Sequence, residues 1–263
     1  MRPKCHALPS FLAWKTRESL ADLIKHEGDH RLTNSTIFWT TPAACMQDEC
    51  MPNASTPAAE RAYEWVKRAI IEGDIAESEM LSEAVIASEL GMSRTPMREA
   101  FLRLEVEGFL KLYPKRGALV VPISPREIRE VYEARLLVDA HSARHICALP
   151  AAERAVIADC LDATIAEQDA ALNAGDMRTY THLDARFHQT IMDNGGNSLL
   201  AHLGHTLRER QQRFTATAIG RNVERARDFV AQHRLLADAL RHGNYSTYRT
   251  ELEDHLTTSR NQL

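Results

Sequence analysis

The second half of the chain is divided into helical segments by a proline and a series of glycines, and this pattern restricts the fold more than any other feature. Between the breaks, apolar residues recur at helical spacing. The segments cover residues 125–148, 151–173, 176–193, 197–218, 222–241 and 244–261. No period of about 20 to 50 residues is present, which argues against a solenoid. Residues 124–263 are therefore predicted to form an all-α antiparallel helical bundle.

Upstream of the bundle the sequence carries three shorter helical segments. Apolar residues share one face of the first segment, and Gly73 ends it. Ser82 is the expected N-cap of the second segment and Gly91 its end, while Thr95 is expected to cap the third, with Pro96 at the first helical position. The second and third segments, joined by a tight glycine turn, predict a helix-turn-helix.

The pattern changes after Gly108. In "FLKLYPKRGALVVP", two short apolar segments flank a basic turn, which predicts a β-hairpin. A helix-turn-helix followed by a hairpin is a winged helix, so the predicted fold is mainly α, with a winged helix-turn-helix at 58–123 ahead of the bundle at 124–263. Residues 1–57 are rich in Thr, Pro, Asn and Ser without a sustained period, and they are expected to form a flexible extension.

Positive charge is concentrated at the start of the third helix and at the hairpin tip, although the net charge of the chain is −4. The helix dipole disfavours cations at a helix N-terminus, so arginines placed there suggest an external anion. Arg94 and Arg98 lie on one helical face, and a guanidinium group can hold O6 and N7 of a guanine. Arg116 and Gly117 are expected to approach the DNA backbone or minor groove. The predicted DNA-binding residues are Ser93, Arg94, Thr95, Arg98, Arg116 and Gly117.

Other basic residues of this region leave two interpretations open. Arg103 either contacts a phosphate or forms a surface ion pair with Glu99 or Glu107. Lys111 and Lys115 are equally ambiguous. The alternative for the whole cluster is that these basic side chains at the start of the helix are only exposed to solvent and bind no ligand.

Nine of the twelve histidines lie beyond residue 140, inside the predicted bundle. Asp184 and His188 are four residues apart on one helical face, and His233 and His255 each lie within an apolar helical face. A buried neutral histidine needs a hydrogen-bond partner or a metal. These four residues would form a site of one oxygen and three nitrogen ligands with open positions, suited to zinc, nickel, manganese or a similar divalent ion.

Two alternatives to this metal site and one alternative role for it stay open. The histidines could be core residues whose hydrogen bonds are satisfied. His202 and His205 form a rival pair, although no carboxylate lies near them in the sequence. A metal with open positions could also activate water in a metallohydrolase, but no further Glu or His is placed as an obvious general base.

Composition indicates a cytoplasmic protein. The five cysteines are odd in number and lack CxxC spacing, which favours reduced thiols. No apolar stretch approaches the roughly 18 residues of a membrane span, and the N-terminus lacks the apolar core and cleavage site of a signal peptide.

The stretch "LSEAVIASELGMSRTPMREAFLRLEVEGFLKLYPKRGALVVP" resembles the DNA-binding domain of the GntR family of transcription regulators. The resemblance implies that Arg94 and Arg98 read bases and that Arg116 reaches the minor groove. The sequence departs from the family in two places. Glu77-Ser78 replaces the usual Pro-Gly, and Ala84 replaces an arginine that often contacts phosphate.

The segments from residue 126 onward resemble the FCD effector-binding domain of the FadR-type subfamily. This resemblance implies that Asp184, His188, His233 and His255 bind a divalent metal ion, and that a small carboxylate joins its coordination sphere. It also places Arg135 as a clamp for the effector carboxylate. An ion pair with Glu133 or Asp139 is the alternative role for Arg135.

Together these features predict a regulator of transcription and not an enzyme. It is expected to bind a pseudo-palindromic double-stranded DNA operator as a homodimer, under the control of a small carboxylate at the metal, and to have no membrane partner. The alternatives are a helical metallohydrolase and a regulator in which the metal is purely structural.

Overall fold

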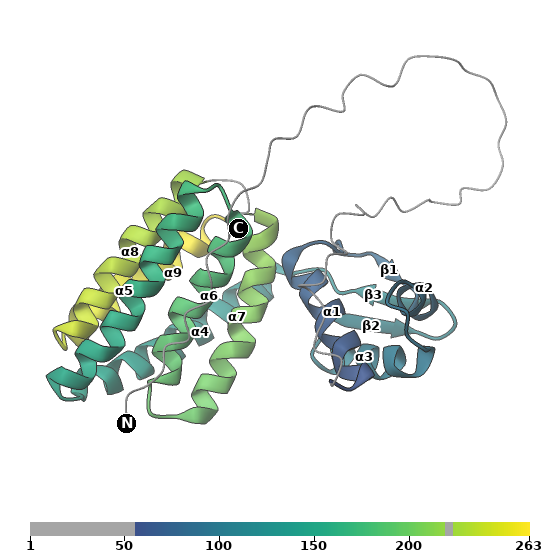
Figure 1. The fold of residues 1–263 in the computed structure, drawn as a ribbon, viewed down its shortest axis with the longest axis horizontal. Coiled ribbons are helices and arrows are strands. Elements are labelled where there is room, and N and C mark those ends of the chain that lie inside the picture. Colours follow the sequence, from purple (N-terminus) through teal and green to yellow (C-terminus); the bar gives the residue numbers. More distant parts are fainter. Residues whose placement is uncertain (1–55, 219–222) are drawn as a thin grey trace, which may run out of the picture. The chain divides into compact units, whose positions relative to one another are not determined.

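The computed structural model describes residues 56–218 and 223–263, which are mainly helical and include one small antiparallel sheet (Figure 1). The predicted extension lies outside the described residues up to residue 55, as does the break at Gly220. The N-terminal elements are α1 (Ala58–Glu72), β1 (Met80–Leu81), α2 (Glu83–Glu89), α3 (Arg94–Val106), β2 (Leu110–Tyr113) and β3 (Gly117–Val120). The helical bundle follows as α4 (Pro125–Ala148), α5 (Ala151–Asn173), α6 (Met177–Asp193), α7 (Ser198–Ala218), α8 (Val223–Arg241) and α9 (Tyr245–Arg260).

The N-terminal elements form the predicted winged helix-turn-helix. Strands β2 and β3 pair antiparallel as the expected hairpin, with Leu110 opposite Val120. Strand β1 was not predicted, because two residues are too few to show a period of two. It pairs with the other side of β3, so that the sheet order is β1-β3-β2. The three helices bury an apolar core with this sheet that includes Val66, Phe101 and Leu104.

The predicted start of the recognition helix was wrong by two residues. Helix α3 begins at Arg94 with Ser93 as its N-cap, so Thr95 and Pro96 lie inside the first turn. Proline is tolerated there because the first amide groups of a helix have no partner within the helix in any case. The sequence pattern therefore could not tell which first-turn position the proline occupies.

The turn before α2 retains a left-handed residue although the sequence lacks the expected glycine. Ser78 has φ of +62°, which is the conformation that glycine adopts most readily. Its backbone amide donates to the carbonyl of Val120 at 3.0 Å, so the sheet holds the turn in place. The substitution of Pro-Gly by Glu77-Ser78 therefore leaves the turn in a strained left-handed conformation.

The six bundle helices match their predicted ranges to within a residue or two. Ser124 caps α4 by accepting a hydrogen bond from the amide of Glu127 at 3.0 Å. Helices α5 and α8 lie side by side, and α4 contacts α6, α7, α8 and α9 (Figure 1). Their shared core is separate from that of the winged helix and includes Phe187, Leu236 and Tyr248.

Two other expectations concern only part of the chain. Cys147 is a free thiol, as expected, whereas Cys5, Cys45 and Cys50 lie outside the described residues. In the described ranges, every helix is too short or too polar to span a lipid bilayer.

Candidate metal centre and nucleic-acid interface

Three histidines from three different helices meet inside the bundle. His188 of α6, His233 of α8 and His255 of α9 are buried, and each offers one ring nitrogen such that all three nitrogens lie within 4.8 Å of one another. The Nε2 atoms of His188 and His255 are 3.2 Å apart. Within the part of the chain that the structure describes, this is the one group of three or more His, Cys, Asp or Glu side chains with such spacing.

Two glutamines orient the rings of this histidine cluster. The Oε1 atom of Gln168 in α5 lies 3.0 Å from Nδ1 of His233, and Oε1 of Gln232 in α8 lies 3.0 Å from Nδ1 of His255. An amide oxygen only accepts, so Nδ1 carries the proton in both rings and each Nε2 presents a lone pair. The Nε2 of His233 is buried without a hydrogen-bond partner. A buried lone pair without a partner, beside two other imidazoles, fits a metal ion better than it fits a satisfied core.

The environment keeps the three rings neutral, which is the state that binds metal. Burial lowers the pKa of His233 to about 4, and it lowers the pKa of His188 and His255 well below the ordinary histidine value. Arg208 and Arg135 act in the same direction, because their positive charges disfavour a further cation. Formation of an imidazolium cation therefore does not compete with metal binding near neutral pH.

Asp184, the predicted oxygen ligand, adjoins the histidine cluster but has a competing partner. Its Oδ1 lies 3.5 Å from Nε2 of His233, while its Oδ2 accepts a hydrogen bond from Arg208 of α7 at 2.5 Å. Burial alone would raise the pKa of this carboxyl group, but Arg208 and the histidines hold it down at about 2. The carboxylate is thus ionised and close enough to join the histidines if Arg208 shares or releases it.

Arg135 forms the ion pair that the sequence had left as an alternative. Its Nη2 donates to Oδ2 of Asp139 at 3.0 Å, and both side chains are fully buried. The Oε1 atom of Gln211 in α7 accepts from Arg135 and, at 3.1 Å, from Arg208. The Oδ2 atom of Asp139 also lies 3.9 Å from Nδ1 of His188, which is too far for a direct hydrogen bond.

Four of the polar side chains that surround the metal ligands were not expected from the sequence. They are Gln168, Arg208, Gln211 and Gln232. Gln168 had a detectable signal, because it lies on the apolar face of α5 with Leu161, Ile165 and Leu172. Arg208 and Gln211 belong to the polar run "RERQQR", in which nothing separates the buried side chains from the exposed ones.

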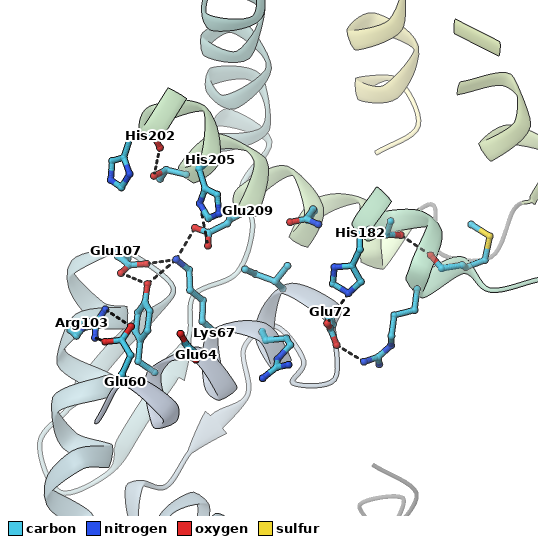
Figure 2. A pocket seen from close by; sticks show the side chains of 18 residues that line it. Glu60, Glu64, Lys67, Glu72, Arg103, Glu107, His182, His202, His205 and Glu209 are labelled. Atoms are coloured by element: carbon cyan, nitrogen blue, oxygen red, sulfur yellow. Dashed lines mark hydrogen bonds and ion pairs between the residues drawn. The ribbon is translucent and has the colours of Figure 1, made fainter. Parts of the chain in front are cut away.

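The rival pair, His202 and His205, lines a different cavity of about 790 Å³ (Figure 2). Both histidines are exposed, and Nδ1 of His205 lies 3.7 Å from Oε1 of Glu209. Neither belongs to a group of three potential ligands among the described residues. The structure therefore gives no support to a metal site at this pair.

Polar contacts join α7 to the winged helix, and those of Lys67 lie in the wall of this cavity. The ammonium group of Lys67 in α1 lies 2.7 Å from Oε2 of Glu209 and 2.9 Å from Oε2 of Glu107 (Figure 2). Arg210 donates to the backbone carbonyl of Glu107 at 2.6 Å. Arg213 donates to the backbone carbonyl of Val121.

The predicted DNA-binding residues are presented at one end of the recognition helix and at the hairpin tip. Ser93, Arg94, Thr95 and Arg98 are all exposed at the start of α3, and Arg116 is exposed in the turn between β2 and β3. Within the described residues, no carboxylate pairs with Arg94, Arg98 or Arg116, which leaves their guanidinium groups available to a ligand.

Two neighbouring positions have structural roles of their own. Gly117 has φ of +106°, and a Cβ atom there would lie 2.2 Å from the carbonyl oxygen of Leu81 in β1, so the sheet itself requires glycine. Arg103 forms an ion pair, as one interpretation held, but the expected partners were wrong. It pairs with Glu60 of α1 and lies over the ring of Tyr63 at 3.8 Å.

Two family models match these two regions of the chain. Residues 58–120 match the model described as bacterial regulatory proteins, gntR family, and residues 130–258 match the FCD domain. The chain is 34% identical over 140 residues to an HTH-type transcriptional regulator of Agrobacterium vitis, covering 53% of this chain and 81% of that protein. It is 30% identical over 200 residues to one of Streptomyces ambofaciens, covering 74% of this chain and 80% of that protein.

A solved structure of a GntR transcriptional regulator from Rhodococcus sp. RHA1 has a similar fold. The TM-score is 0.66, and the match covers 79% of this chain and 97% of that chain. At 20% sequence identity, this likeness shows the fold alone.

Proposed function

The chain belongs to the GntR family of bacterial regulatory proteins and is a DNA-binding regulator of transcription with an FCD domain, and from this premise we propose that a small carboxylate controls its binding to DNA. The carboxylate binds at a divalent metal ion held by Asp184, His188, His233 and His255. The metal supplies a Lewis acid with open positions for a carboxylate oxygen. Since the relatives are transcription regulators, the bundle is proposed to be a sensor and not a metallohydrolase. A regulator of transcription acts where the chromosome is, so a cytoplasmic location is part of the proposal.

The observation that carries the metal site is the state of the three imidazoles. Gln168 and Gln232 fix the rings of His233 and His255 so that their Nε2 lone pairs face the cluster, and the Nε2 of His233 has no partner. Burial also keeps these rings neutral. One carboxylate and three imidazoles suit zinc, nickel or manganese.

DNA recognition is proposed to rest on α3 and the hairpin tip. Arg94 and Arg98 are placed to read guanines in the major groove, where the N-terminal residues of a recognition helix contact base edges. Ser93 and Thr95 are proposed to contact phosphates, and Arg116 with Gly117 to reach the backbone or minor groove. A homodimer would present two such surfaces to a pseudo-palindromic operator.

Helix α7 is the proposed link between effector and DNA. Arg208 and Gln211 on this helix contact the ligand residue Asp184 and the candidate effector residue Arg135. The neighbouring Glu209 and Arg210 contact the winged helix through Lys67 and Glu107. Any displacement of α7 by the effector therefore alters contacts to the DNA-binding domain directly.

The test begins with chelator-treated full-length protein and selection of binding sites from a randomised DNA duplex library. DNA affinity is then measured by fluorescence anisotropy with each divalent ion alone and with a panel of small carboxylates. A metal-dependent change in affinity caused by one carboxylate class supports the proposal. A bound metal with no carboxylate effect would leave the metal a structural role, and binding of neither would refute the sensor.

A further inference from the structure

Arg208 forms an ion pair with Asp184, whose carboxylate is the proposed oxygen ligand of the metal ion. Its Nη2 lies 2.5 Å from Oδ2 of Asp184, and its Nη1 donates to Gln211 at 3.1 Å. The arginine side chain is only 3% exposed, and its Nε has no partner. A cation of the protein thus lies beside the histidine cluster, on the same carboxylate as the proposed metal.

The charges around the histidine cluster balance without a metal. Arg135 and Arg208 are positive, Asp139 and Asp184 are negative, and the three buried imidazoles are neutral. A divalent cation added to this set brings an excess of two positive charges into a largely buried region. An unbalanced buried charge is costly, so an anion must enter with the metal or after it.

The two arginines differ in what the metal does to them. Arg135 retains its carboxylate partner, because Asp139 is not a proposed metal ligand. Arg208 loses all or part of its partner, because Asp184 is proposed to bind the metal through the same carboxylate. Once the metal is bound, Arg208 is therefore the nearest buried cation in need of a new anion.

We propose that the effector is a small dicarboxylate, with one carboxylate on the metal ion and the other on the guanidinium group of Arg208. This inference rests on the proposed metal site and specifies the class of its ligand. The two negative charges of such an effector offset the two charges that the metal adds. A monocarboxylate offsets only one, and it leaves Arg208 buried without a full partner. Planar guanidinium and carboxylate groups form a pair of parallel hydrogen bonds, which gives the second contact its specificity.

The experiment compares acids of equal chain length on the zinc-loaded full-length protein by isothermal titration calorimetry. The matched probes are succinate against butyrate and malonate against propionate. Wild-type protein is expected to bind at least one dicarboxylate about tenfold or more tightly than its monocarboxylate partner, as a charge-assisted pair implies. In Arg208→Gln, this preference is expected to disappear, while zinc binds the chelator-treated protein about tenfold more tightly because no guanidinium competes for Asp184.

Arg241→Gln is the matched control. Arg241 is the last residue of α8, and its partners are Asp159 and Asp162 of α5, neither of which is a proposed metal ligand. It is expected to leave both the zinc affinity and the dicarboxylate preference unchanged. Thermal unfolding of each variant tests whether it is folded. If Arg208→Gln does not fold, the comparison of dicarboxylates with monocarboxylates on wild-type protein still tests the class of the effector.

The outcomes separate this inference from the function on which it depends. Zinc uptake with equal affinity for both acids of each pair would overturn the dicarboxylate alone. A dicarboxylate preference that persists in Arg208→Gln would overturn the role of Arg208. Failure of the wild-type protein to take up zinc, nickel or manganese would overturn the metal site and this inference together.

Discussion

Lys67 of α1 and Glu209 of α7 form an ion pair of 2.7 Å between the winged helix and the bundle. Both side chains are largely buried, and Glu209 directly follows Arg208, which holds the predicted metal ligand Asp184. Two adjacent residues of one helix thus contact the effector region and the DNA-binding domain. The pKa of Lys67 is raised although burial opposes this, because Glu209, Tyr63 and Glu107 stabilise its charge.

The Lys67–Glu209 pair is expected to transmit the effector signal. Lys67→Met and Glu209→Gln should each weaken the effect of the bound carboxylate on DNA affinity, and the double variant should add little to either single one. Since the pair is mostly shielded from water, we expect an interaction free energy of about 1 kcal/mol in a double-mutant cycle of urea unfolding. Additive effects in the cycle, with an unchanged effector response, would show that another contact carries the signal.

The recognition helix is expected to lose specificity when its free arginines are removed. Arg94→Ala or Arg98→Ala should each cost about 1–3 kcal/mol of DNA-binding free energy and relax the preference at one base position. Arg116→Ala should weaken binding to all sequences and reduce the slope of log affinity against log salt by about 1. Anisotropy titrations with selected duplexes at several salt concentrations measure both effects. Arg126→Ala, at an exposed arginine of α4 that pairs with Glu130, is the control and should change neither.

Metal binding is expected to stabilise the protein through His233. A divalent ion at about one hundred times its dissociation constant should raise the free energy of unfolding by about 2.7 kcal/mol. His233→Ala should abolish this gain, and Gln168→Ala should lower metal affinity about tenfold or more, because Gln168 orients the ring. The measurement is thermal unfolding of chelator-treated protein during metal titration. His242→Ala, at an exposed histidine in the turn that directly follows the same helix, should behave as wild type; an equal loss there would argue against this site.

The metal-free protein is expected to lose stability as the pH falls from about 6.5 to about 4. His233 has a pKa of about 4 when folded and an ordinary value of 6.5 when unfolded. Between these values the unfolded chain binds the extra proton, so acid favours unfolding, by about 3 kcal/mol from His233 alone. The pKa of Asp184 is 3.8 in the unfolded chain and about 2 in the folded protein. Its contribution to stability is therefore lost only below this pH window.

Urea unfolding at about pH 7 and about pH 4.5 measures this loss of stability. His233→Gln should lose clearly less than wild type over the same interval, because a glutamine does not titrate. His242→Gln should lose as much as wild type. If His233→Gln lost as much stability as wild type between the two pH values, His233 would not be the group whose protonation destabilises the folded protein.

The turn before α2 is expected to gain stability from the glycine that it lacks. Ser78 adopts φ of +62°, which costs an ordinary residue about 1–2 kcal/mol. Ser78→Gly removes this strain, but glycine also gains entropy in the unfolded chain, so the net gain should be about 0.5–1 kcal/mol. Ser78→Ala keeps the strain and should not gain. Equal melting temperatures for wild type and Ser78→Gly would show that the turn is not strained.

Much of the fold was predictable because it depends on local patterns. The ends of α4 and α5 follow from Ser124, Pro150 and the apolar spacing between them, which act within a few residues. The hairpin was equally clear from "LYPKRGALVV". The start of α3 was wrong by two residues because a proline fits several first-turn positions, and β1 was missed because two residues carry no pattern.

In the candidate site, too, some features follow from local sequence spacing and others only from helix packing. Asp184 and His188 share a face because they are four residues apart, and this much is determined by the sequence itself. That His233 and His255 approach them was an expectation from their apolar helical faces, which the family resemblance supported, and only the packing of α6, α8 and α9 brings the three ring nitrogens within 4.8 Å. Helix packing depends on side chains far apart in sequence, which no local period encodes.

The sequence by itself determined that the chain forms a winged helix and a helical bundle, and which residues offer ligand atoms. The tertiary structure alone decided that Arg208 takes the carboxylate of Asp184, that Gln168 and Gln232 orient two of the imidazoles, and that Glu209 contacts Lys67. Each of these contacts joins different helices or lies inside a polar run. Whether such a contact forms depends on how whole helices pack, because that packing determines which polar side chains are buried together.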